Sequence, residues 1–159
     1  MLACDLAALG YPGFSHLKHD RTKSPAEVVL AALKVSDLEP RVTEGLPWVL
    51  YAYPDLDWEW LVREAVLHEL QNKLGFLANV ARRLAEELGG SEAVKTLSEY
   101  EAVLDQSRLV REETLCHESI TQVERKWLML NRPKEAEHWG LLTDLSPEHL
   151  SSIPRNSRG

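Results

Sequence analysis

The chain has 159 residues, of which 44% are apolar and 27% charged, and its formal net charge is −7. This length fits one domain with a sizeable core, and the composition excludes a collagen-like, low-complexity or wholly disordered chain. The sequence has no apolar run near the ~20 residues of a membrane span, no basic segment of a secretory signal and only two cysteines, so we expect a cytoplasmic protein with reduced thiols.

The first part of the chain contains one strong helix start. Residues 1–23 are interpreted as an N-terminal arm, a short helix followed by a loop. The sequence Ser-Pro-Ala-Glu at 24–27 is a capping box with proline in the first turn, which predicts a helix to about Leu33. Over 38–53 we expect two short helical pieces, because Pro47 lacks a backbone donor and ends or kinks a helix.

The clearest periodic pattern lies over 58–88. From Leu67 onward, leucine and alanine recur at alternating spacings of three and four, which is the seam of a long amphipathic helix. Gly89 and Gly90 end this helix, and a second helix is expected over 91–115. Because the link between them is so short, the two helices are expected to run antiparallel and form a hairpin.

Shorter elements follow the hairpin. Thr121 and Glu124 form a second capping box, which opens a helix through Leu130. A short helix is expected over 133–139, and a last turn begins at 146–147.

Together these elements predict an all-α fold. The antiparallel hairpin of 58–88 against 91–115 is its centre, and short helices flank both ends within one domain over 1–153. No alternating run is long enough for a sheet. Residues 154–159 have the composition of a disordered tail.

Acidic residues gather between Glu86 and Glu124, where ten acidic side chains accompany three basic ones, while the remainder of the chain is neutral overall. Such a stretch repels phosphate backbones, so direct nucleic-acid binding is not expected. It either attracts a basic partner protein or is simply a solvated helix face. The candidate acidic contacts are Glu99, Glu112 and Glu113.

Aromatic residues are unusually dense just before the predicted hairpin. Five tryptophans is a high number for this length, and three of them lie within 48–60. Helical spacing does not place Trp58 and Trp60 on one face, so one ring either packs beneath the 47–54 segment or is an exposed partner anchor. The candidate partner-binding aromatics are Trp48, Tyr51, Trp58 and Trp60.

The sequence contains no phosphate-binding loop, dinucleotide fingerprint, HExxH or CxxC motif, and its scattered histidines and cysteines predict neither a metal site nor a cofactor. Small helical HEPN ribonucleases use an arginine and a histidine four to six residues apart, as phosphate ligand and as acid or base. About one such pair is expected by chance, so an ordinary charged surface is the alternative. The pairs with this spacing are Arg63–His68, Arg111–His117 and Arg132–His138.

Three segments carry a resemblance to a known group of proteins. They are the runs Leu-Glu-Pro-Arg-Val-Thr-Glu-Gly-Leu-Pro-Trp-Val-Leu at 38–50, Pro-Asp-Leu-Asp-Trp-Glu-Trp-Leu-Val at 54–62 and Leu-His-Glu-Leu-Gln-Asn-Lys-Leu-Gly-Phe at 67–76. Over roughly residues 24–90 the chain resembles small bacterial regulators or antitoxins of toxin–antitoxin pairs. The resemblance implies a non-enzymatic protein that binds and silences a cognate toxin and also represses its operon.

The expected function is therefore protein binding. The sequence shows no helix-turn-helix with a basic recognition helix, which favours toxin binding over DNA binding. We expect occlusion of a basic toxin, with the aromatic candidates as anchors and the acidic candidates as charge partners. The alternatives are a HEPN-like ribonuclease, with Arg63, His68, Arg111 and His117 as its candidates, and a self-associating helical adaptor.

Overall fold

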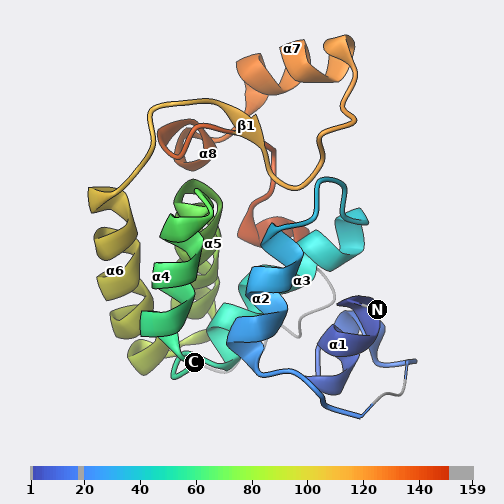
Figure 1. The fold of residues 1–159 in the computed structure, drawn as a ribbon, viewed down its shortest axis with the longest axis vertical. Coiled ribbons are helices and arrows are strands. Elements are labelled where there is room, and N and C mark those ends of the chain that lie inside the picture. The colour runs from blue at the N-terminus through green and yellow to red at the C-terminus, as the bar shows by residue number, and fades with distance from the viewer. Residues whose placement is uncertain (1, 18–19, 151–159) are drawn as a thin grey trace.

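The part of the chain that the computed structural model describes, residues 2–17 and 20–150, is built mostly of α-helices, as predicted (Figure 1). The helices are α1 (Leu2–Ala8), α2 (Pro25–Leu33), α3 (Pro40–Ala52), α4 (Trp58–Leu67), α5 (Gln71–Leu88), α6 (Ser91–Gln106), α7 (Gln122–Asn131) and α8 (Lys134–His138). Two short 3-10 turns, η1 (Pro12–Phe14) and η2 (Pro147–His149), accompany them. Two short strands, β1 (Glu113–Thr114) and β2 (Leu141–Leu142), pair in parallel as a minor sheet. The predicted tail at 154–159 lies outside the described residues.

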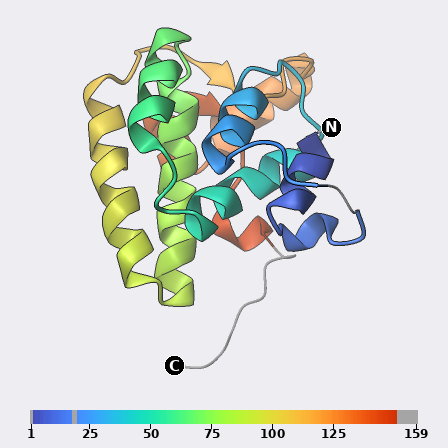
Figure 2. The same ribbon diagram turned by 60° about the horizontal axis from the view of Figure 1, so that its bottom comes forward.

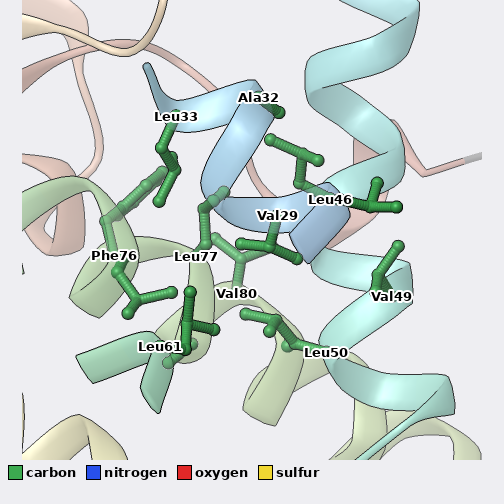
Figure 3. Close-up of a cluster of buried hydrophobic side chains, with 14 of the residues drawn as sticks. Val29, Ala32, Leu33, Leu46, Val49, Leu50, Leu61, Phe76, Leu77 and Val80 are labelled. Carbon is green, nitrogen blue, oxygen red and sulfur yellow. The ribbon is translucent and has the colours of Figure 1, made fainter. Parts of the chain in front are cut away.

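Helix α5 forms the centre of the core. Every residue from Gln71 to Ala81 is buried, so this part of the helix is covered on all sides, whereas Glu86 and Glu87 near its end are exposed. Leucine and valine side chains from α2, α3 and α4 meet Phe76, Leu77 and Val80 of α5 in one apolar cluster (Figure 3). The expected N-terminal helix is α1, and its Leu6 is fully buried. The described part of the chain contains no helix with the length and apolar character to cross a membrane.

Helices α5 and α6 lie side by side, joined by Gly89 and Gly90 (Figures 1 and 2). Gly89 adopts a left-handed conformation, with φ of +84°, which a glycine tolerates at a helix end. The predicted stop at the glycine pair is therefore confirmed.

The prediction of one continuous helix over 58–88 is wrong, because a turn interrupts the helix between α4 and α5. The break is a Schellman turn: the Leu70 amide donates to the Ala65 carbonyl at 2.7 Å, and the Glu69 amide donates to the Val66 carbonyl at 3.1 Å. Glu69 takes the left-handed conformation, with φ of +59°, that glycine normally occupies at this point. Leu67, expected on the buried seam, is consequently 70% exposed.

The second hairpin helix is also shorter than predicted, ending at Gln106 rather than near 115. Two buried amide side chains of α5 take over the backbone that follows. Gln71 donates to the Ser107 carbonyl at 3.0 Å, while Asn72 both donates to and accepts from the Leu109 backbone at 2.8 Å. These bonds satisfy the backbone without a helix, so the chain continues in extended form.

Helix α3 is one helix over Pro40–Ala52, with Pro47 inside it, where two pieces were expected. Pro47 is buried, and Leu46, Val49 and Leu50 around it are fully buried. Burial of this apolar face therefore outweighs the missing backbone hydrogen bond. Both predicted capping boxes, at the starts of α2 and α7, are confirmed.

Candidate functional site

Helix α7 stands apart from the core, above β1 (Figure 1). None of its residues is buried, although half of them are apolar. Val123, Trp127 and Leu130 recur at the spacing of one helix face and are 78%, 52% and 86% exposed. We call these three residues the α7 ridge. A contiguous exposed apolar face of this kind is a candidate interaction site.

Local hydrogen bonds, and not packing against the core, stabilise the start of α7. The Glu124 amide donates to the Thr121 hydroxyl at 3.1 Å, and the Thr121 amide donates to the Glu124 carboxylate at 3.0 Å. The backbone bond from Thr121 holds the pKa of the Glu124 carboxyl below its usual range, so this side chain is ionised near neutral pH. The helix start is thus fixed by its own sequence.

A cleft of about 330 Å³ lies between α7 and the start of α3. Its apolar lining includes the side chains of Leu38, Leu115, Leu142 and Leu145, all nearly or fully buried. Trp127 lines the cleft as well as the α7 ridge, so the two features are continuous. The polar lining residues are Thr43, Glu44, His117, Glu124, Thr143 and Asp144.

One wall of the cleft is formed where residues 116–119 pair with residues 36–38. The Leu38 amide donates to the Cys116 carbonyl at 2.8 Å, and His117 lies 3.6 Å from the Asp37 carboxylate. A backbone hydrogen bond from Ser119 is the main reason that the pKa of Asp37 is lowered. Burial raises the pKa of the Cys116 thiol to about 11, which makes it a poor nucleophile.

The predicted aromatic anchors are divided between the core and half-buried positions. Trp58 is only 3% exposed and stacks on Tyr100 with ring centroids 4.6 Å apart, so its ring belongs to the core and is not an accessible anchor. Trp48, Tyr51 and Trp60 are partly buried and pack against the core. Each of these three rings therefore exposes only part of its surface, and they do not form one fully exposed aromatic patch.

The predicted acidic contacts do not lie on one helix. Glu99 is exposed on α6, whereas Glu112 and Glu113 follow that helix in the extended segment. Glu112 accepts a hydrogen bond from Arg132 at 2.5 Å. Glu113 is half-buried, 3.5 Å from Arg111 and 3.9 Å from Lys73. Two of the three carboxylates are thus already paired within the chain.

The Arg–His candidates occupy separate surroundings. Arg63 is exposed on α4, and His68 lies 3.7 Å from Glu64. Arg111 donates to the Glu69 carbonyl at 2.8 Å and shares a groove with His68, whereas His117 lines the cleft.

The third Arg–His pair is split in the same way. Arg132 bonds to Glu112, while His138 lies 2.7 Å from Asp105 and is the main cause of that carboxyl's lowered pKa. In the part of the chain that the structure describes, no hydrogen bond links the arginine of any of these pairs to its histidine. Within the described residues, no group of three or more His, Cys, Asp or Glu side chains is placed to hold a metal ion.

Sequence reasoning placed a helix at α7 but did not identify its exposed face. The spacing of Val123, Trp127 and Leu130 is also that of a helix packed on a core, so periodicity alone does not separate the two cases. The cleft was also missed, because Pro40, Leu115 and Leu145 come from distant segments. Comparisons with protein families, curated proteins and solved structures found no match for this chain.

Proposed function

We propose that this protein is a non-enzymatic protein-binding module that neutralises a cognate partner by covering its active surface, as bacterial antitoxins do. The α7 ridge is the docking element. The observation that carries this proposal is the exposure of Val123, Trp127 and Leu130 on a helix with no buried residue. The resemblance of residues 24–90 to antitoxins supplies the class of partner.

The energetics of the α7 ridge suit a binding hot spot. Burial of a large apolar side chain contributes about 1.5–3 kcal/mol, and tryptophan is enriched among residues that dominate interfaces. The ridge is carried on a capped helix, so much of its ordering cost is met before the partner arrives. Burial of Trp127 and Leu130 against a flat partner surface would therefore contribute most of the binding free energy.

Charge points to a basic partner. Glu92 and Glu99 are exposed on α6 and make no ion pair within the described part of the chain. Exposed carboxylates of this kind speed the encounter with a cationic protein and contribute less to final affinity. We place this encounter in the cytoplasm, where Cys4 and Cys116 persist as free thiols.

The test is neutralisation of a purified partner. The chain is used as bait in its source cells, and the stoichiometric basic protein that co-elutes is then expressed alone and with the chain. We expect the partner alone to arrest growth and the wild-type chain to restore it. Trp127→Ala combined with Leu130→Ala is expected to abolish rescue and weaken binding at least tenfold, because both anchors are lost.

Val110→Ala is the matched control, because Val110 is 97% exposed but lies outside α7. This variant is expected to rescue growth fully. If the chain itself arrests growth, and His68→Ala or His117→Ala abolishes that arrest, the protein is instead a HEPN-like ribonuclease. A bait that elutes only with itself, as a dimer broken by Leu130→Ala, would establish the self-associating adaptor.

A further inference from the structure

The cleft beside α7 combines an apolar floor with an acidic rim. Its floor is formed by leucines and by Trp127 and Leu128 from α7. Three carboxylates line it, Glu44, Glu124 and Asp144, and the described residues of its lining include no lysine or arginine. Among the described lining residues, His117 is the one side chain of a basic type, and it lies beside the Asp37 carboxylate.

The rim carboxylates are unneutralised. Glu44 and Asp144 have no ion pair or side-chain hydrogen bond within the described residues, and Glu44 is only half-buried. Glu124 uses its carboxylate to cap α7 and keeps its negative charge. Three negative charges around an apolar hollow attract cations and repel acidic segments.

We propose that the cleft binds a cationic segment of the partner protein, in which one or two large apolar side chains are flanked by lysine or arginine. The apolar side chains fill the leucine-lined floor, and the flanking cations meet Glu44, Glu124 and Asp144. This inference rests on the proposed function and adds to it the chemistry of the segment that is recognised. The α7 ridge then covers the surface next to that segment, because Trp127 belongs to both features.

A short fluorescein-labelled peptide of alternating leucine and lysine is the probe, and its anisotropy with the purified full chain reports binding. The same peptide with glutamate in place of lysine is expected not to bind. Glu44→Gln combined with Asp144→Asn is expected to weaken binding about tenfold at low salt. The effect is expected to be smaller at high salt, because salt already screens the charge contacts between the wild-type chain and the peptide.

Asp55→Asn combined with Glu59→Gln is the matched control, since it removes two exposed carboxylates in and just before α4, away from the cleft lining, and changes the net charge equally. This control is expected to stay within about twofold of the wild-type affinity. Trp127→Ala is expected to weaken binding at all salt concentrations, because it removes part of the apolar lining. Far-UV circular dichroism shows whether each variant keeps the wild-type helix content.

Equal weakening by the two double variants would mean that net charge alone attracts the peptide, and the proposal would fall. Binding of the glutamate peptide would overturn it too. So would a dimer in the unliganded chain that Glu44→Gln and Asp144→Asn dissociate, because a second copy would then occupy the cleft. The peptide assay needs no partner protein, so the two experiments are independent. A failed peptide assay does not contradict the proposed function, and failed rescue by the wild-type chain does not contradict peptide binding in the cleft.

Discussion

Glu69 and Gly75 are two positions where a single residue decides how α5 sits in the fold. Glu69 occupies a left-handed conformation that usually belongs to glycine, and its carbonyl and carboxylate both accept hydrogen bonds from Arg111. The long-range clamp by Arg111 offsets part of the backbone strain. Arg111, a candidate for phosphate chemistry in the sequence, therefore has a structural role at the α4–α5 break.

Gly75 lets Trp139 approach α5 closely. A Cβ atom at Gly75 would lie 2.3 Å from the Trp139 ring, and that ring is only 2% exposed. Gly75→Ala should gain up to about 1 kcal/mol of helix propensity but lose about 1–3 kcal/mol through overpacking. We expect a net fall in the free energy of unfolding, measured by urea denaturation.

The smaller ring of Trp139→Phe gives the control for this prediction. In that background the added methyl group has more space, so Gly75→Ala should cost less than it does in the wild-type chain. A net stabilisation by Gly75→Ala in the wild-type chain would show that the ring yields freely, contrary to the packing argument.

At the scale of elements, helices α2 and α7 begin with the same motif but sit in different surroundings. Ser24 and Glu27 cap α2, and Thr121 and Glu124 cap α7. Most of α2 is buried, whereas α7 buries nothing. The same local signal therefore supports one helix of the core and one that projects from it.

Removal of each cap should separate the two roles. Ser24→Ala and Thr121→Ala each cost their helix about 1 kcal/mol. For α2 we expect that loss in the global free energy of unfolding, measured by urea denaturation. For α7 we expect an unchanged global value and about fivefold faster amide hydrogen exchange confined to 122–131, because this helix opens locally. An equal global loss in both variants would place α7 in the cooperative core.

The helix boundaries marked by local signals were predictable here, and those set by distant residues were not. The caps at Ser24 and Thr121 and the glycine pair after α5 are local signals, and the chain obeys them. The end of α4 depends on Glu69, which has no residue-type signature of a stop, and the end of α6 depends on Asn72, which lies on another helix. Such long-range hydrogen bonds leave no pattern in the neighbouring sequence.

At the scale of the molecule, residues 107–150 return over α5 and close its exposed side. Leu115, Trp139, Leu141 and Leu150 are all nearly or fully buried, and Asn72 ties Leu109 to α5. The same segment also forms one side of the cleft. The lining of the cleft comes from the start of α3, from residues 115–117, from α7 and from residues 142–145. The candidate site could not be predicted from sequence, because it exists only once these segments are brought together.

This arrangement predicts opposite results for two tryptophans twelve residues apart. Trp139→Ala should lower the free energy of unfolding by about 3–5 kcal/mol, since it empties a buried site against α5. Trp127→Ala should change it by less than about 0.5 kcal/mol, because that ring is 52% exposed on α7. Urea unfolding followed by tryptophan fluorescence and far-UV circular dichroism measures both, and the two probes should coincide if residues 107–150 unfold with the core. Separate transitions for the two probes would contradict a shared core. If the Trp127→Ala chain is as stable as the wild-type chain, its loss of partner binding comes from the lost surface contact and not from unfolding.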